Sequence, residues 1–189
     1  MKATKRLARV TGLIFGVLVA MMLLPAAFGL AARVTVGQPA PSFRVESGEG
    51  KKLTLEMLRG KIIVLFYESR EVLGKNKDIK DELKAFYRRQ PPTLQNLVLR
   101  LVVIDCTPAF WATRHIWKTK LVEGSRKEGF IIYGDWTGQM QADYGLKADD
   151  SNFLIIDPQG IIRYMAQGKI RRERFGEIKS LLTQLAGLD

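Results

Sequence analysis

The sequence predicts an α/β domain in which a central mixed β-sheet carries helices on both faces. Two apolar runs, residues 62–67 and 97–104, are rich in β-branched side chains and are typical of strands that are covered on both faces. A segment with helical periodicity separates them, which indicates a parallel crossover. Two later apolar runs flank a turn and predict an antiparallel C-terminal hairpin from Asn152 to Tyr164. The resulting order β, α, β, α, β, α, β, β, α fits this fold class.

The segments around the first central strand have recognisable signals. Prolines within residues 35–43 favour an extended start, and the glycines of residues 48–50 mark a turn. After the strand, Asn76 is a candidate N-cap for a helix that ends at Pro91-Pro92. The apolar residues of this helix recur at helical spacing: Ile79, Leu83, Phe86 and Tyr87.

A second helix is expected from Ala109 to Lys120, after the second central strand and a loop that contains Asp105. Its four large apolar residues are expected to pack the helix onto the sheet, and the alternative is that they line a groove. These residues are Phe110, Trp111, Ile116 and Trp117. The only histidine, His115, lies in the same segment, nine residues after Cys106. A Cys-His pair would need an orienting third group, and the sequence offers no such group.

The last third of the domain supplies the edge of the sheet. A third strand is expected over residues 130–133 and a short helix over residues 135–144, with Gly145 as its C′ residue. Asp157-Pro158-Gln159-Gly160 fits a type I turn, with Asp first, Pro second and Gly fourth. The C-terminal helix has an apolar face made of Phe175, Ile178, Leu181, Leu182 and Leu185.

The N-terminus predicts export. Four cations and no acid precede an apolar stretch from Val10 to about Ala32, and Gly29-Leu30-Ala31 is the best cleavage tripeptide. We therefore expect a signal peptide over residues 1–31 and one domain over residues 32–189, located in the periplasm. The alternative is an uncleaved inner-membrane anchor with the domain in the periplasm, because about 20 apolar residues can span a bilayer.

Composition narrows the function classes. The 189 residues carry a net charge of +11, and without the four signal cations the domain has 26 basic and 19 acidic residues. The charges of both signs are interleaved, and export separates the protein from nucleic acid, so we expect no nucleic-acid partner. One cysteine and one histidine are too few for a usual zinc site, and we expect neither a metal nor a cofactor.

The order of these segments resembles the thioredoxin-like superfamily, and in particular its redoxin or peroxiredoxin-like domains. The opening Val36-Gly-Gln-Pro-Ala-Pro-Ser-Phe43 and the step Leu58-Arg-Gly-Lys61 look like the corresponding parts of peroxiredoxins and thiol reductases. Tyr144-Gly145 followed by Asp157-Pro-Gln-Gly160 continues the likeness. The resemblance implies a three-layer thioredoxin-like fold. A closer resemblance, carried by residues 147–160, is to the YtfJ-like family of periplasmic proteins, which brings no established activity.

The resemblance also implies where redox chemistry would take place. Redox members carry a Cys-x-x-Cys pair at a helix N-terminus, where the helix end stabilises the thiolate. Here the matching positions hold Glu71 and Gly74, and the usual cis-proline position falls near Asp150. The resemblance therefore implies a degenerate active site. It favours a redox-inactive binding or accessory protein of the periplasm, whose partner is an envelope protein or a small ligand.

Two sets of residues remain as candidate sites. Cys106 follows the second central strand, at the sheet edge where α/β proteins bind ligands. It is the catalytic candidate of the alternative function, a single-cysteine oxidoreductase or antioxidant that uses an external thiol. Asp105 would raise the pKa of this thiol, which favours a buried packing role instead. The second set is a candidate binding groove with paired carboxylates, or else a salt-bridged loop: Glu68, Arg70, Glu71, Asp149 and Asp150.

Overall fold

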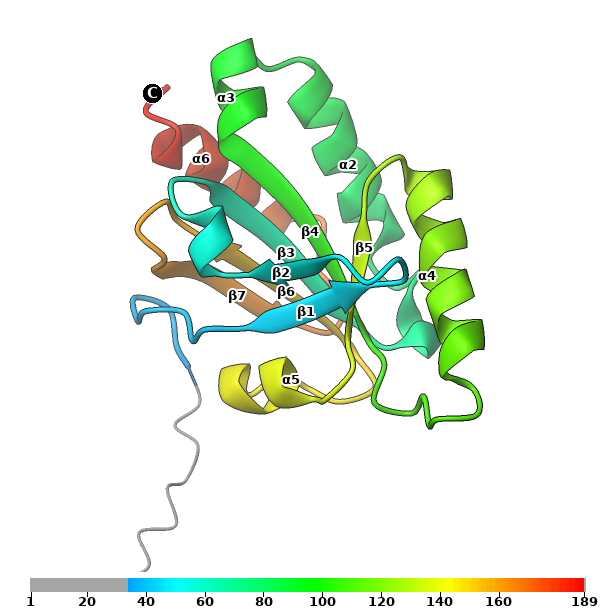
Figure 1. The fold of residues 1–189 in the computed structure, drawn as a ribbon. Coiled ribbons are helices and arrows are strands. Elements are labelled where there is room, and N and C mark those ends of the chain that lie inside the picture. The colour runs from blue at the N-terminus through cyan, green and yellow to red at the C-terminus, as the bar shows by residue number, and fades with distance from the viewer. Residues whose placement is uncertain (1–33, 189) are drawn as a thin grey trace, which may run out of the picture. The chain divides into compact units, whose positions relative to one another are not determined.

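The computed structural model describes residues 34–188 and contains one seven-stranded mixed sheet (Figure 1). The predicted signal peptide lies outside the described residues. In spatial order the strands run β2-β1-β5-β4-β3-β6-β7. Their bounds are β1 Arg44–Ser47, β2 Lys52–Thr54, β3 Ile62–Glu68, β4 Val98–Asp105, β5 Ile132–Asp135, β6 Ser151–Ile156 and β7 Ile162–Gln167. Strands β3, β4 and β5 are parallel, and the neighbours on both sides pair antiparallel. The predicted fold class is confirmed.

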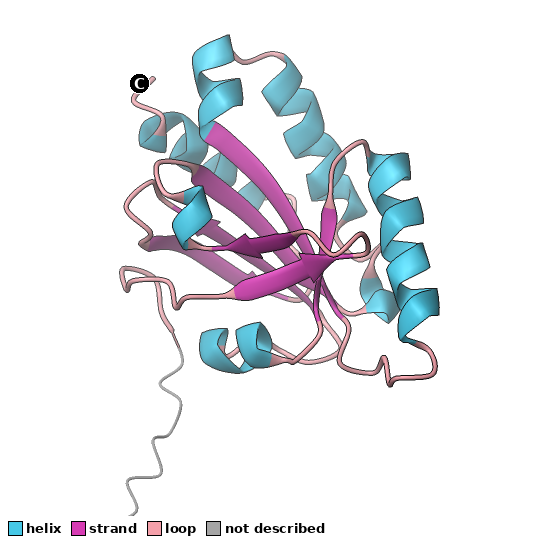
Figure 2. Ribbon diagram, viewed as in Figure 1, coloured by secondary structure: helices cyan, strands magenta, loops and turns pink. Residues whose placement is uncertain are grey.

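Helices cover both faces of this sheet (Figure 2). One face carries four helices: α2 Lys77–Arg88, α3 Pro92–Leu97, α4 Arg114–Glu128 and α6 Arg174–Leu185. Of these, α2, α3 and α6 share a core with β3 and β6, and α4 packs on a smaller cluster with β4 and β5. On the other face, α5 Gln139–Tyr144, the 3₁₀ turn η2 Glu56–Leu58 and the β1–β2 hairpin enclose a second core. None of the helices in residues 34–188 combines the length and the apolar character needed to cross a bilayer.

The C-terminal hairpin, the end of α5 and the start of α2 lie where they were predicted. The Gly160 amide donates to the Asp157 carbonyl at 2.9 Å, which closes the expected turn between β6 and β7. Gly145 ends α5 with a left-handed φ of 60°. Asn76 occupies the N-cap position of α2, but its side chain caps no helix amide. It donates instead to Ser151 Oγ and the Gly168 carbonyl, each at 2.8 Å, and accepts from the Ile170 amide at 2.9 Å.

The segment after β4 differs most from prediction. Helix α4 begins at Arg114 rather than Ala109 and continues to Glu128, where Gly129 takes a left-handed conformation. The chain turns first because the Thr107 amide and hydroxyl both donate to Asp105 Oδ1, at 2.9 and 2.7 Å. The expected packing onto the sheet was wrong for three of the four large apolar residues: Phe110, Trp111 and Ile116 are 59%, 89% and 48% exposed. The fourth, Trp117, is half-buried and packs against a small buried cluster beneath α4, as expected.

Three smaller differences concern short elements. The glycine-containing turn joins two strands, β1 and β2, which were not predicted because their four and three residues carry little apolar pattern. α2 ends at Arg88, shortly before the expected stop at Pro91-Pro92, and Pro92 begins α3, where a missing amide is tolerated at the first helical position. Asp135 ends β5 instead of beginning a helix, and α5 starts only at Gln139.

Candidate functional site

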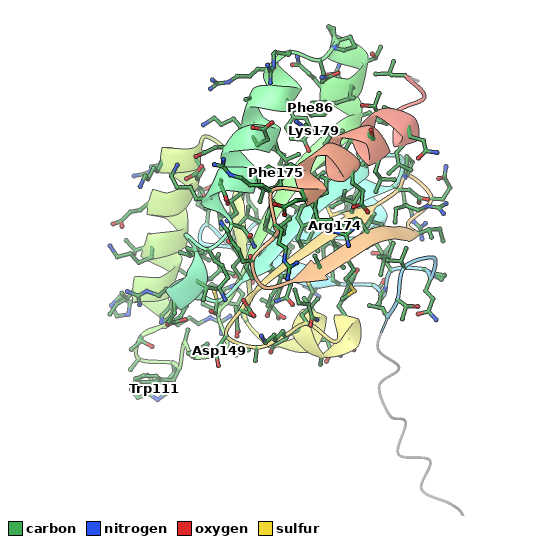
Figure 3. The ribbon with its side chains drawn as sticks, turned by 180° about the vertical axis from the view of Figure 1, so that it is seen from behind. Phe86, Trp111, Asp149, Arg174, Phe175 and Lys179 are labelled. Carbon is green, nitrogen blue, oxygen red and sulfur yellow. The ribbon has the colours of Figure 1, made fainter. Side chains whose placement is uncertain are left out.

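The carboxyl ends of β3, β4 and β5 meet at one edge of the sheet. β3 ends at Glu68, β4 at Asp105 and β5 at Asp135, and Cys106 follows β4 directly. The loop before β6 reaches the same edge, because the Ser69 amide donates to the Asp150 carbonyl at 3.4 Å. In Figure 3, Trp111 and Asp149 stand at this end of the molecule. The two segments of the candidate groove therefore lie side by side.

Cys106 is a packing group in the structure. Its side chain is fully buried in a small cluster with Ile104, Leu121 and Ile132. Gly134 on β5 leaves the space for it, since a Cβ atom at that position would lie 2.7 Å from the Cys106 Sγ. The thiol fills a volume that the neighbouring strand keeps open.

The surroundings of Cys106 oppose ionisation. Burial raises the pKa of the Cys106 thiol to about 12, and the carboxylates of Asp105 and Asp135 add to the shift. The thiolate is the nucleophilic form of cysteine, and reactive cysteines occupy electropositive, partly exposed positions. Cys106 has neither property, so its environment favours an unreactive thiol at neutral pH.

Asp135 organises the edge, and sequence reasoning did not single it out. Its carboxylate is fully buried and accepts from the amides of Gly138 at 2.9 Å and Gln141 at 3.2 Å. It also accepts from the Tyr67 hydroxyl at 3.3 Å, and burial together with Asp135 raises the pKa of that tyrosine. A carboxylate directly after the third strand was the available signal, because parallel strands end at a common edge.

Two carboxylates of the candidate groove are already paired. Glu68 is fully buried, lies 2.5 Å from Lys80 Nζ and accepts from Ser151 Oγ at 2.9 Å. Asp150 is buried between Lys75 at 2.5 Å and Lys147 at 2.8 Å, and hydrogen bonds from Lys147 and Lys75 hold its pKa well below its usual range. These ion pairs neutralise the groove floor, and the lowered pKa leaves the Asp150 carboxylate little proton affinity for acid–base work.

The other three groove residues face solvent. Arg70 belongs to the 3₁₀ turn η3 Arg70–Val72 and lies over the Trp117 ring at 5.6 Å, and Glu71 is exposed beside it. Asp149 is exposed and has a left-handed φ of 52°. Glu71 and Gly74, at the positions implied for a cysteine pair, precede α2. In residues 34–188 there is no cis peptide bond and no group of three metal-ligating side chains.

An exposed apolar surface lies next to the groove. It consists of residues 107–113, which we call the aromatic loop, and of Ile116 in the first turn of α4. Phe110 and Trp111 of the loop are exposed, and so is Ile116. His115 is also exposed, and it lies in the first turn of α4. Large apolar side chains gathered on a surface are typical of interaction sites. Sequence reasoning named these residues but placed them in the core, with a groove as the alternative.

Comparison with known proteins agrees with the architecture. The chain is similar to the thiol:disulfide interchange protein DsbE of Chlorobium tepidum, at 16% identity and a TM-score of 0.59, over 82% of this chain and 99% of that one. A thiol peroxidase from Chromobacterium violaceum matches at 12% identity and a TM-score of 0.57, over 80% and 88%. A peroxiredoxin-like protein from Aquifex aeolicus matches at 14% identity and a TM-score of 0.54, over 81% of this chain and 88% of that one.

These likenesses at low identity show the thioredoxin-like fold. Among proteins with curated descriptions, none is significantly similar to this chain. A family model described as the AhpC/TSA family matches residues 36–165, from the extended start through most of β7. This match covers well over half of the sequence. The chain belongs to the AhpC/TSA family.

Proposed function

We propose that the protein is an exported accessory protein that binds a protein partner at the carboxyl edge of its sheet, without thiol–disulfide exchange. Residues 1–31 direct export and are removed, and residues 32–189 form the periplasmic domain. Within the superfamily, the block of residues 147–160 supports placement in the YtfJ-like family. The partner contacts the aromatic loop and the exposed groove residues Arg70, Glu71 and Asp149.

The single observation that carries this proposal is the exposure of Trp111. Its side chain is 89% exposed, and Phe110 and Ile116 are exposed nearby. Tryptophan and tyrosine dominate the energetics of protein interfaces because their large rings bury much apolar area. Charged residues of both signs flank this loop, as in the polar rim of an interface.

The state of the cysteine supports the absence of redox exchange. Such exchange needs an accessible thiolate and, in this fold, a second cysteine to resolve the mixed disulfide. The chain has one cysteine, which is buried and has a raised thiol pKa. The alternative, a single-cysteine oxidoreductase, requires Cys106 to become exposed, and no feature of its packing favours this.

Site-specific photo-crosslinking in cells tests the binding function. A photo-reactive phenylalanine analogue is placed at position 111, and the matched control carries it at Met57, which is 66% exposed on η2. We expect a discrete crosslinked partner from position 111 alone, weakened by Glu71→Gln combined with Asp149→Asn. No crosslink at 111, or the same products from both positions, would contradict the proposal.

Two further measurements address the redox state and the location. Titration of the folded protein with a thiol reagent, with Cys106→Ser as the blank, should label no cysteine until the protein is unfolded. A native thiol that reacts with an apparent pKa below about 8.5 would support the oxidoreductase instead. N-terminal sequencing of the envelope fraction should place the mature start at residue 32, whereas an intact Met1 there would indicate an anchor.

A further inference from the structure

The middle of the sheet is left partly open on the face that carries α2 and α4. β4 is the central strand, yet Arg100 is exposed and Val98 and Val102 are only half-buried. A groove of 410 Å³ lies over this strand, and a narrower recess of 70 Å³ adjoins it. We call the two together the β4 groove. Its rim and walls include Lys84, Tyr87, Arg88, Val98, Arg100 and Phe130.

The floor of the β4 groove is apolar. The recess is lined by Val64 and Phe66 of β3, Leu83 of α2 and Val102 of β4. Phe130, from the loop before β5, closes one side and lies 5.1 Å from the Arg100 guanidinium. An apolar floor with a few placed polar groups, at a volume of several hundred Å³, is typical of small-molecule sites.

The rim of the groove carries unbalanced positive charge. Lys84, Arg88 and Arg100 form no ion pair with any acid in residues 34–188. The recess is also lined by Lys80, which is paired with Glu68 and lies over the Phe66 ring, and by two acids: Asp81, which is paired with Lys77, and Glu128. The unpaired cations of the rim therefore outnumber the unpaired acids. Lys84 and Arg88 lie on successive turns of α2, and Arg100 lies at the centre of β4.

A buried hydroxyl in the groove lacks a partner. Tyr87 is 9% exposed, and its hydroxyl has no hydrogen-bond partner within the described part of the chain. Burial raises the pKa of Tyr87, while the nearby Arg100 opposes the shift, so the hydroxyl stays protonated and can donate. Buried polar groups are almost always satisfied, and an orphan hydroxyl beside a cavity indicates a missing acceptor.

We propose that the β4 groove binds a small amphipathic carboxylate, in which one anionic headgroup is joined to an apolar chain. The carboxylate accepts from the Tyr87 hydroxyl and pairs with Arg100, and the chain lies on the apolar floor formed by Phe66, Val102 and Phe130. This site is separate from the carboxyl edge, because Arg100 lies five residues before the end of β4. A medium-chain fatty acid is the simplest molecule of this class.

Calorimetric titration of the exported protein with decanoate tests the proposal. We expect saturable 1:1 binding, and binding of the neutral 1-decanol or of inorganic phosphate at least about tenfold weaker, since the site needs both the charge and the chain. Arg100→Gln should weaken decanoate binding about tenfold. Lys127→Gln, which removes an exposed cation of α4 outside the groove, should leave the affinity unchanged.

Tyr87→Phe separates ligand binding from folding. Removing an unsatisfied hydroxyl should leave the melting temperature of the free protein unchanged or raise it, while decanoate binding weakens severalfold. The proposal is overturned if decanoate shows no saturable binding, or if decanol or phosphate binds as well as decanoate. It also fails if Arg100→Gln and Lys127→Gln bind alike, or if Tyr87→Phe keeps full affinity.

Discussion

The Glu68–Lys80 pair at the floor of the carboxyl edge offers the sharpest test of the electrostatics. Glu68 is fully buried, Lys80 is 26% exposed, and the two charges lie 2.5 Å apart. Lys80→Met keeps the length and helix propensity of the side chain but leaves the Glu68 carboxylate buried with only the Ser151 hydroxyl as a partner. Breaking a buried pair from one side typically destabilises by about 3–5 kcal/mol, because an uncompensated charge remains.

The magnitude can be checked with a matched control on the same helix. Lys77→Met breaks the Lys77–Asp81 pair, whose side chains are 76% and 60% exposed, and should change stability little. Urea unfolding followed by circular dichroism gives the free energy for each variant. The double variant Glu68→Gln/Lys80→Met should recover much of the loss, since both charges are then absent. Equal effects of Lys80→Met and Lys77→Met, or no recovery in the double variant, would refute the reasoning.

Three further predictions concern the same edge. Gly134→Ala should lower the free energy of unfolding, measured with urea, by about 1–3 kcal/mol, because its Cβ would lie 2.7 Å from the Cys106 Sγ. Adding Cys106→Ala should relieve this clash. If the stability losses of the two single variants simply add in the double variant, the clash is not the cause. Hydrogen bonds from Lys147 and Lys75 lower the pKa of Asp150 in the folded state, so its stabilisation is fully present above the ordinary aspartate pKa of 3.8 and is lost as pH falls from there towards the folded-state pKa. The stability gap between wild type and Asp150→Asn should therefore close on acidification, and a constant gap would exclude the ion pairs as its source. Trp111→Ser should leave the melting temperature within about 2 °C, since the side chain is 89% exposed, and a larger drop would show that the loop contributes to stability.

The sheet could be read from the sequence because its signals are local. The run that became β3 is continuously apolar, and the run that became β4 is interrupted only by Arg100. The turn at Asp157 has Asp, Pro and Gly at the positions that a type I turn favours. The aromatic loop could not be read in this way. Large apolar residues are usually buried, and Phe110 and Trp111 break that rule where the Asp105 side chain forces a turn. An exposed aromatic residue gives no periodic signal that distinguishes it from a core residue.

The candidate site was predictable in position but not in pairing. Glu68 and Cys106 share one edge because parallel strands end on the same side. Asp150 joins them because it precedes β6, which begins at this edge and runs antiparallel to β3. Glu68 pairs with Lys80 of helix α2, and Asp150 pairs with Lys75 of the loop before that helix. The sequence separation of these residues follows no rule from which the ion pairs could be predicted. A partly buried packing role for Cys106 was expected from its place at a strand end, and a raised thiol pKa from its acidic neighbour Asp105. Its contact with Gly134 could not be expected, because it depends on the register between β4 and β5.

The Asn76 side chain has a consequence for the order in which the protein folds. It joins the start of α2 to Ser151, Gly168 and Ile170, residues 75 to 94 positions later in the chain. Closing such long loops costs conformational entropy, which is offset only when further contacts form. We therefore expect the hydrogen bonds of Asn76 to form after the folding transition state. Substitutions there should then speed unfolding more than they slow folding. The side-chain amide of Asn76 would then set how long the native state persists, and not how fast the protein folds.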